Sequence, residues 1–554
     1  MLKENLVALV ETAIRENWDR PALTDYGQRT VTFSQVGRRI KFFHLLFKKC
    51  QVKRGDHIAV CGPNSVNWAE AYLAVVTYGA TVVPILTDFQ TEDIHHIVNH
   101  SESRFFFLTD AIYSRLDEEM MPALEGLFSL DNERFVINGS RSVVSAVEWA
   151  EEESRSPRQA LTREEFRLPG DIPNDAIAAL VYTSGTTGFS KGVMLPYNSL
   201  VANILFGDAN ITLPQPAPII SFLPMAHAYS CSFEFLFPFT VGAHITFLGV
   251  IPSPKILLEA FAEVRPCLVI SVPLVMEKIF KKRIAPVINT AKVKLLLKTP
   301  GISSLLRRKI KKALREAFGG KYEVIVIGGA ALNPEIEEFF RKIKLRFTVG
   351  YGMTECGPLI SYAPWDEHRP GSVGKVVTNL EIKIDSPSPA TQAGEIMVKG
   401  EHVMAGYYKN PTATDEVLGE DGWLRTGDLG IIDKDGFIFI RGRSKNMILG
   451  PSGQNIYPEE IENKINSMEF VQESLVIESE GRPIALIYPD WEAIDSLKPK
   501  QQDREGWLNK VMENIKKEVN RQLPRYAAIS RVKVQPEPFE KTPTQKIKRY
   551  LYKI

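Results

Sequence analysis

A repeated alternation of short apolar runs with helical patterns, between residues 50 and 350, constrains the fold more than any other feature of this sequence. Short apolar runs bounded by turn residues are typical of buried strands. We expect such strands at His57–Cys61, Thr81–Leu86, Arg104–Leu108, Ile177–Tyr182, Ile219–Leu223, His244–Leu248, Cys267–Val272 and Val324–Ile327. We expect helices between them at Asn64–Tyr78, Asn198–Phe206, Ser253–Val264 and Pro334–Ile343. The alternation predicts an α/β fold with largely parallel sheets, in which ligands bind at the carboxyl ends of the strands.

The sequence changes character after Tyr351. Short alternating runs at Ser372–Ile384, Gly394–Val398 and Gly436–Ile440 predict a small antiparallel barrel or sandwich packed on the α/β part. A basic connector at 441–445 leads into a final segment with its own α+β pattern. We therefore predict a large domain, a hinge and a small mobile C-terminal domain. Their bounds are 1–442 (α/β subdomains 1–350, β-rich subdomain 351–442), 443–445 and 446–554.

The composition excludes several classes of protein. Apolar residues make up 44 % and charged residues 24 % of the 554 residues, which is typical of a globular enzyme. A net charge of +1 argues against a protein built mainly to bind nucleic acid. The five cysteines include no C-x-x-C pair, which fits a reducing compartment. The chain starts with an amphipathic segment and has no apolar run long enough to span a membrane, so we expect a cytoplasmic protein.

The stretch LVYTSGTTGFSKG, residues 180–192, places small hydroxyl side chains, glycines and a lysine directly after an apolar run. Such residues allow backbone N–H groups to close around a phosphate, while the lysine adds positive charge. The spacing is not that of the Walker loop, because Ser190 and Gly192 stand where that motif needs a glycine and a hydroxyl residue. Ordinary P-loop kinase or ATPase chemistry is therefore disfavoured. The simpler alternative is a surface turn rich in serine, threonine and glycine.

Together with motifs later in the chain, YTSGTTGFSKGV resembles the phosphate-binding signature of the adenylate-forming superfamily. That superfamily includes acyl-CoA synthetases, firefly-type luciferases and the adenylation domains of peptide synthetases. The motifs occur in the family's order and extend the resemblance over nearly the whole chain. The resemblance implies that this loop holds the β- and γ-phosphates of ATP. The residues concerned are Thr183, Ser184, Gly185, Thr186, Thr187, Gly188 and Lys191.

Two further motifs of the large domain resemble those that contact the acyl group and the adenine. In LPMAHAY, His227 stands where the family keeps a residue beside the acyl carboxylate. In GGAAL, the residues Gly328, Gly329 and Ala330 resemble the segment that walls the adenine. A helix opened by Asn333 as N-cap is expected to follow.

The motif VGYGMTE resembles the most diagnostic one of the family. The resemblance implies that Tyr351, beside Gly352, stacks on the adenine and that Thr354 contacts the α-phosphate region. It also implies that Glu355 ligates Mg²⁺, which prefers one carboxylate together with phosphate oxygens. In LRTGD, Asp428 is the implied acceptor for the ribose hydroxyls.

The remaining motifs lie at the hinge and near the C-terminus. Arg443 resembles the family arginine that reaches the ribose, and Lys445 stands at the family's hinge position. Gly453 belongs to a loop that resembles the segment lining the pantetheine passage. In KTPTQKIKR, Lys546 matches the lysine that bridges carboxylate and α-phosphate, although Gln545 replaces the usual glycine.

The resemblance as a whole implies a Mg²⁺- and ATP-dependent ligase that uses coenzyme A. An acid and ATP would give acyl-AMP and pyrophosphate, and CoA would then give the thioester and AMP. Because most nucleotide groups precede the hinge and Lys546 follows it, we expect the small domain to dock for adenylation and then rotate. A non-catalytic lipid- or nucleotide-binding relative is disfavoured because Lys191, Glu355, Asp428 and Lys546 are all retained.

The acid is expected to be a medium- or long-chain fatty acid. Residues 226–233 contain no acidic side chain, whereas peptide-synthetase domains place an aspartate there for the substrate's amino group. A deep apolar pocket suits an acyl chain, since each buried CH₂ contributes ~0.8 kcal/mol. The expected pocket residues are Phe233, Phe235, Leu236, Phe237, Phe239, Val272, Pro273 and Leu274.

Two runs, VISVPLVMEKIFKK and KNMILGPSGQNIYPEEIE, look most like long-chain acyl-CoA synthetases. Some of those enzymes carry a tryptophan gate where this chain has Cys231, so the chain length stays open. An acyl-AMP ligase that loads a carrier protein and a CoA ligase for aryl acids remain alternatives. The sequence does not indicate an oligomeric state.

A strongly basic segment lies between Lys278 and Lys321, where fourteen Lys and Arg residues accompany one acid, Glu316. Apolar residues recur at helical spacing from Ile302 to Phe318. One interpretation is a helix on anionic lipid, which would place the protein at the inner face of a membrane, or a guide for anionic substrates. The other is a surface helix that packs its apolar stripe on the core and leaves its charges in water.

Overall fold

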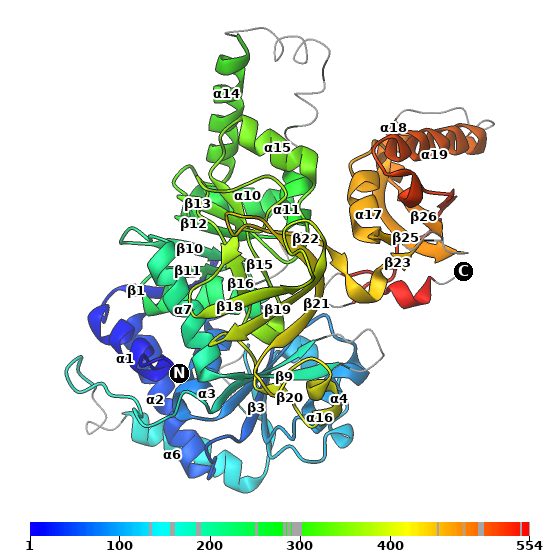
Figure 1. The fold of residues 1–554 in the computed structure, drawn as a ribbon. Helices are drawn as coiled ribbons and strands as arrows, with labels where there is room; N and C mark the ends of the chain where they lie inside the picture. Colours follow the sequence, from blue (N-terminus) through cyan, green and yellow to red (C-terminus); the bar gives the residue numbers. More distant parts are fainter. Residues whose placement is uncertain are drawn as a thin grey trace.

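The computed structural model describes residues 1–131, 136–155, 161–183, 190–249, 253–280, 284, 290, 302–450, 454–479, 482–496, 504–542 and 546–552. The large domain contains two sheets with helices packed against them, and a smaller C-terminal domain lies to one side (Figure 1). This arrangement confirms the predicted α/β fold with a separate C-terminal domain.

The first sheet has eight strands in the order β20-β9-β8-β4-β3-β5-β6-β7. Its five central strands are parallel, and β9, β20 and β7 add antiparallel edges. The central strands are almost fully buried, which explains why they read as continuous apolar runs. Their bounds are β3 His57–Cys61, β4 Thr81–Ile85, β5 Phe105–Leu108, β6 Gly126–Ser129, β7 Val136–Gly139, β8 Ile177–Thr183, β9 Lys191–Pro196 and β20 Gly406–Tyr407.

The second sheet has seven strands in the order β14-β13-β12-β10-β11-β1-β2, all parallel except β2. Its bounds are β1 Pro21–Asp25, β2 Thr30–Thr32, β10 Pro218–Ser221, β11 His244–Phe247, β12 Leu268–Ser271, β13 Val324–Ile327 and β14 Phe347–Val349. The principal helices of the large domain are α1 Leu6–Glu16, α2 Phe33–Lys49, α3 Val66–Tyr78, α4 Thr91–His100, α6 Arg141–Arg155, α7 Tyr197–Asn210, α10 Pro254–Val264, α11 Pro273–Ile279, α14 Ile302–Ala317 and α15 Pro334–Lys342.

The β-rich part is antiparallel, as predicted, with a four-stranded sheet β18-β19-β21-β22 and a three-stranded sheet β15-β16-β17. The expected single strand at 372–384 is divided in two. Asn379 adopts a left-handed backbone (φ 63°), which ends the extended conformation between β17 and β18. The bounds are β15 Tyr351–Gly352, β16 Leu359–Tyr362, β17 Lys375–Val376, β18 Leu380–Asp385, β19 Gly394–Gly400, β21 Leu424–Ile432 and β22 Ile438–Arg443.

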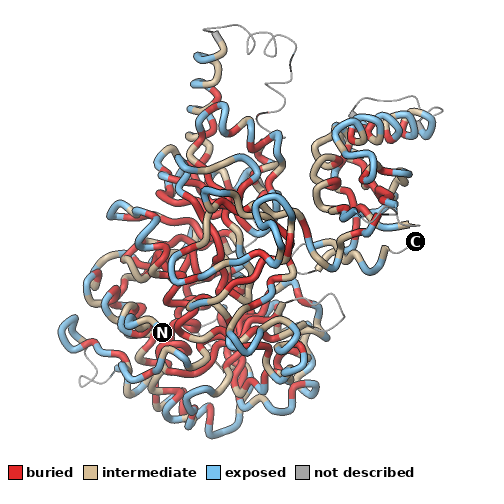
Figure 2. The backbone as a smooth tube through the Cα atoms, viewed as in Figure 1, coloured by how far each residue is buried: buried red, intermediate tan, exposed pale blue. Residues whose placement is uncertain are grey.

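The C-terminal domain has a core of its own, visible as a separate buried cluster in Figure 2. Strands β25 (Val471–Ser479), β26 (Arg482–Pro489) and β27 (Arg531–Val534) form its sheet, against which α17 (Pro458–Asn466) and α19 (Arg504–Arg521) pack. A separate core is what allows a domain to move as a unit.

Candidate active site

A cleft of about 2230 Å³ lies at the carboxyl ends of both parallel sheets. It is lined by the last residues of β8, by residues that directly follow β10, β12, β13 and β14, and by residues of the C-terminal domain. This is the position at which α/β sheets bind ligands, because the loops after parallel strands meet at one edge.

Every predicted catalytic and nucleotide-binding residue that the structure describes lines this one cleft, although the residues come from distant parts of the chain. They are Thr183, Lys191, His227, Gly328, Gly329, Ala330, Tyr351, Gly352, Thr354, Glu355, Asp428, Arg443, Lys445 and Lys546. The remaining predicted site residues lie outside the described part of the chain. These are Ser184, Gly185, Thr186, Thr187, Gly188 and Gly453. Gln545, which replaces the usual glycine, also lies outside the described part.

The residues on either side of the predicted phosphate loop belong to two antiparallel strands. Thr183 at the end of β8 pairs with Lys191 at the start of β9. The Lys191 ammonium lies 4.7 Å from the ring centroid of Tyr407, and the Tyr407 hydroxyl donates a 2.8 Å hydrogen bond to Glu355 Oε1. Tyr407 therefore links the two charged groups expected at the phosphates, and the sequence analysis did not identify it.

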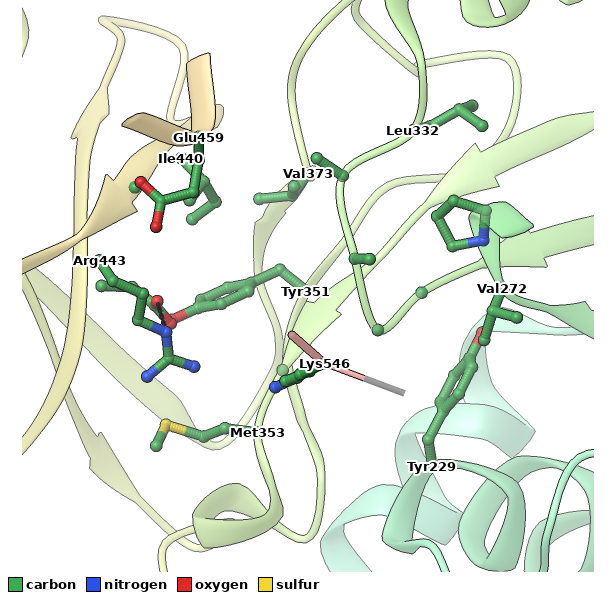
Figure 3. A pocket seen from close by; sticks show the side chains of 18 of the residues that line it. Tyr229, Val272, Leu332, Tyr351, Met353, Val373, Ile440, Arg443, Glu459 and Lys546 are labelled. Atoms are coloured by element: carbon green, nitrogen blue, oxygen red, sulfur yellow. Dashed lines mark hydrogen bonds and ion pairs between the residues drawn. The ribbon is translucent and has the colours of Figure 1, made fainter. Parts of the chain in front are cut away.

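Tyr351, Asp428 and Arg443 form a hydrogen-bonded group in the cleft, and Figure 3 shows Tyr351 beside Arg443. Asp428 accepts a 2.6 Å hydrogen bond from the Tyr351 hydroxyl and a 2.7 Å ion pair from Arg443 Nε. Adjacent strands create the pair, because Asp428 and Arg443 are register partners across β21 and β22. Burial raises the pKa of Asp428, and the charge of Arg443 opposes that rise. The carboxylate is thus held in place with acceptor capacity facing the cleft.

The glycine segment after β13 allows a close approach of side chains from a neighbouring helix. A Cβ on Gly328 would lie 3.0 Å from the Tyr229 ring, and Gly329 adopts a left-handed backbone (φ 86°). Asn333 then caps α15, as predicted, by accepting a 2.9 Å hydrogen bond from the Glu335 N–H. The segment presents backbone with little side-chain bulk to the cleft, which suits a flat base.

His227 lies at the start of the short helix α8 (Ala228–Ser230), in the loop after β10. Burial, and then the nearby charge of Lys546, lower the pKa of His227 to about 4. The imidazole is therefore neutral at pH 7 and can donate one hydrogen bond without adding charge.

Buried polar side chains fix the loop that carries His227. Asn64 donates to the Leu223 carbonyl (2.7 Å) and accepts from the Met225 N–H (2.9 Å). Fully buried Glu234 accepts hydrogen bonds from the Ser221 hydroxyl and from the N–H of Leu223. Burial raises the pKa of Glu234 well above its ordinary value, while the hydrogen bonds that it accepts oppose that rise. No sequence motif predicted that Asn64 and Glu234 hold this loop.

Lys546 is one of the cations that the C-terminal domain contributes to the cleft, and Figure 3 shows it between Tyr351 and Met353. The Lys546 side chain is exposed to solvent in the open cleft, although protein lies around it on several sides. Desolvation, and then the charge of Arg443, lower the pKa of Lys546, while Asp428 and Glu355 oppose the shift. These four charged groups therefore face a common space.

A divalent cation fits this space only with help from a ligand. Within the described part of the chain, no three His, Cys, Asp or Glu side chains are grouped so that they could hold a metal ion. A single carboxylate, Glu355, is nevertheless what Mg²⁺ needs when phosphate oxygens and water complete its octahedron. The donor set is thus consistent with a metal that arrives with a nucleotide.

The apolar part of the cleft differs from the predicted pocket. Phe233, Val272, Pro273 and Leu274 line the cleft, as expected. The assignment of Phe235 to the pocket is wrong, since its ring is fully buried against Trp68 and Tyr72. The same correction applies to Leu236, Phe237 and Phe239, which are core residues. The actual apolar lining near His227 includes Phe206, Ile211, Phe222, Ala226, Tyr229, Ile270, Val326 and Leu359.

The reason lies in the helix that carries these rings. Residues Cys231–Leu236 form a π-helical turn, followed by α9 (Phe237–Thr240). The segment is buried on every side, so neither hydrophobicity nor helical spacing separates the pocket-facing ring from the core-facing ones.

Comparison with known proteins gives consistent matches over the whole chain. The profile described as AMP-binding enzyme matches residues 10–408, and the profile described as AMP-binding enzyme C-terminal domain matches residues 445–552. A long-chain-fatty-acid–CoA ligase of Mycobacterium tuberculosis is 27 % identical over 591 residues, covering 99 % of this chain and 94 % of that protein. Another from Escherichia coli O6:H1 is 26 % identical over 499 residues, covering 85 % and 82 %.

Solved structures share the fold. The chain superposes on an anthranilate CoA ligase in complex with anthranoyl-AMP with a TM-score of 0.78, at 20 % identity, covering 100 % of this chain and 97 % of that one. It superposes on O-succinylbenzoate coenzyme A synthetase from Bacillus subtilis, in complex with AMP, with a TM-score of 0.75 at 21 % identity, covering 99 % and 98 %.

Proposed function

Because the chain belongs to the AMP-binding enzyme family, we propose that it is an AMP-forming ligase that joins a fatty acid to coenzyme A. One observation carries the proposal. Lys546 of the C-terminal domain shares a cleft with Tyr351, Asp428, Arg443 and Glu355 of the large domain. The groups proposed to bind the nucleotide and a cation from the other domain thereby lie in one cleft.

In the first step, a carboxylate oxygen of the acid attacks the α-phosphorus of ATP, and pyrophosphate leaves. The reacting groups are both anions, so fixed cations and N–H donors must face the developing charge. We assign Lys546 to the α-phosphate and carboxylate, and neutral His227 to the carboxylate. Thr354 contacts the α-phosphate region, and Lys191 with Thr183 holds the outer phosphates.

We assign the nucleotide to the group around Asp428. Asp428 accepts the ribose hydroxyls, Arg443 supports it, and Tyr351 lies against the adenine that Gly328–Ala330 flank. Mg²⁺, held by Glu355 and phosphate oxygens, would neutralise charge on the triphosphate. These roles agree with the positions of the side chains in the cleft.

In the second step, the sulfur of coenzyme A attacks the acyl carbonyl, the bond to phosphate oxygen breaks, and AMP leaves. We propose that residues 443–445 act as the hinge about which the domain of residues 446–554 reorients between the steps. The separate core of that domain supports such a movement.

We assign a fatty acid because apolar side chains, among them Phe222, Ala226 and Phe233, line the cleft together with His227. ATP–pyrophosphate exchange over fatty, aryl and amino acids tests this assignment. A medium- or long-chain fatty acid is expected to support the fastest exchange. Product formation with coenzyme A against a holo-carrier protein then separates a CoA ligase from a carrier-loading enzyme. Preference for an aryl acid, or for the carrier, would replace the proposal by that alternative.

Replacing Asp428 by asparagine is expected to raise the KM for ATP by roughly tenfold in the exchange assay. The change keeps the shape of the side chain but removes a charged acceptor, which is worth ~1.5–3 kcal/mol. Asp433→Asn is the matched control, since Asp433 pairs with Arg369 in the same β-rich part but does not line the cleft. An unchanged KM in Asp428→Asn would remove Asp428 from the ribose site.

We also propose that α14 makes peripheral contact with anionic membranes. The helix projects from the body of the large domain (Figure 1). Ile310, Leu314 and Phe318 pack on the core, so the second half of α14 is a surface helix with its apolar stripe on the core and its charges in water. Leu305, however, is 60 % exposed beside a run of basic side chains, a combination suited to a lipid surface. No helix within the described ranges has the length and apolar character needed to cross a bilayer.

Reversing three exposed charges of α14, Arg308→Glu/Lys309→Glu/Lys312→Glu, is expected to lower binding to phosphatidylglycerol vesicles by roughly 100-fold. Each basic residue near an anionic surface contributes about 1 kcal/mol. Sedimentation with anionic and with neutral phosphatidylcholine vesicles measures the effect. The triple reversal at Lys510, Lys517 and Arg521 on α19 is the control. Equal vesicle binding by both triple variants would show that the charges of α14 only face water and do not bind the membrane.

A further inference from the structure

The short segment that carries Lys546 is anchored by an arginine three residues later. Two backbone hydrogen bonds, both 2.8 Å, join residues 540–542 to residues 546–548. The Thr542 N–H donates to the Lys546 carbonyl, and the Lys548 N–H donates to the Glu540 carbonyl. Arg549 follows and donates to the Val476 carbonyl of β25 (3.2 Å) and to the carboxylate of Glu462. Arg549 therefore ties this segment to β25 and to α17 of the domain core.

Glu462 is a buried carboxylate on α17, and its contacts make it a rigid partner. Its Oε1 accepts a 2.6 Å hydrogen bond from the Val476 N–H, while Oε2 accepts from Arg549. Burial raises the pKa of Glu462 to about 7, and the charge of Arg549 opposes that rise. The pair is thus coupled: loss of Arg549 would favour protonation of Glu462 rather than leave a bare buried charge.

Glu459, one turn earlier on α17, extends the same network to the hinge. Its Oε1 accepts a 2.6 Å hydrogen bond from Asn446 Nδ2 and lies 3.7 Å from Arg549 Nη2. Its Oε2 is buried without a hydrogen-bond partner in the described part of the chain and faces Gly442, where a Cβ would lie 2.6 Å away. Figure 3 shows Glu459 on the side of the cleft that holds Arg443.

From this geometry we propose that Arg549, held by Glu462 and Glu459, is a positioning residue that fixes the Lys546 segment relative to the hinge. The inference rests on the proposed function, because it concerns the adenylation step assigned to Lys546. In this proposal Arg549 acts through the placement of the Lys546 ammonium rather than by contact with the reactants. A displacement of about 1 Å at a reacting group lowers a rate by roughly 100-fold.

Arg549→Met tests the inference. The kcat of ATP–pyrophosphate exchange is expected to fall roughly 10- to 100-fold with little change in the KM for ATP, since the nucleotide contacts remain. Conversion of supplied acyl-AMP and coenzyme A to thioester should stay within roughly threefold of wild type, because Lys546 is not assigned to that step. Arg549→Lys, which keeps a cation beside Glu462, should recover part of the exchange activity.

Two further variants separate positioning from folding. Arg549→Met/Glu462→Met removes both charges together and should fold while remaining slow in exchange. Arg521→Met is the matched control, since it removes another Arg–Glu pair of this domain, on α19, and should exchange like wild type.

Exchange by Arg549→Met within about threefold of wild type, or equal losses in both half-reactions, would overturn the inference. Absence of exchange in the wild-type protein would instead overturn the proposed function, and this inference with it.

Discussion

Lys546→Ala is expected to lower the rate of acyl-AMP formation by roughly 100- to 1,000-fold. The ammonium is assigned to charge that develops when the carboxylate attacks the α-phosphorus, and the loss of one such preorganised donor costs about 2.7–4 kcal/mol. Thioester formation from supplied acyl-AMP should change far less, because that step needs no bridge between carboxylate and triphosphate. The measurement is pyrophosphate exchange beside thioester formation, on the same preparation.

Lys548→Ala provides the control for Lys546→Ala. It removes a neighbouring cation from the same segment, whose ammonium lies 3.8 Å from Glu540. This variant should retain exchange activity. Equal losses in both half-reactions of Lys546→Ala would contradict the assignment of this lysine to one step of two.

Glu355→Gln is expected to lower adenylation by roughly 10- to 100-fold and to raise the Mg²⁺ concentration needed for half-maximal rate. The amide keeps the volume of the side chain and an oxygen for the Tyr407 hydroxyl, but it loses the negative charge that a hard cation prefers. Mutating a residue that only hydrogen-bonds to a metal ligand lowers activity roughly 10- to 100-fold, so replacing the ligand itself should lower it at least as much. Titration of exchange activity with Mg²⁺ gives both numbers.

Tyr407→Phe separates the hydrogen bond from the carboxylate. It removes the hydroxyl that donates to Glu355 but retains the ring on which Lys191 lies. Its effect on the Mg²⁺ requirement should be smaller than that of Glu355→Gln. An unchanged Mg²⁺ dependence in Glu355→Gln would place the metal elsewhere.

The charged part of the site follows from the sequence because each group sits in a short contiguous motif. Lys191, Glu355, Asp428 and Lys546 were all identified in this way, and the structure brings them to one cleft. The parallel sheets were likewise predictable, since strands buried on both faces, such as β4, read as unbroken apolar runs.

Contacts between distant segments could not be predicted. Tyr407 reaches Glu355 because β20 pairs with β9 more than two hundred residues earlier in the chain, and a single sequence carries no signal for that register. No sequence motif marks Glu234, whereas in the structure it braces the loop before His227. The rings of Phe235 and its neighbours were misassigned because hydrophobicity alone does not distinguish a core from a pocket.

The central claim is that an oxygen of the acid becomes bonded to the α-phosphorus of ATP before the thioester forms. The most direct measurement uses a fatty acid whose carboxylate carries a heavy oxygen isotope, incubated with the protein, ATP, Mg²⁺ and coenzyme A. Mass spectrometry of the nucleotide should find one labelled oxygen in AMP, because the bridging oxygen leaves with AMP when sulfur attacks the carbonyl. Unlabelled AMP, or label in inorganic phosphate accompanied by ADP, would contradict the account.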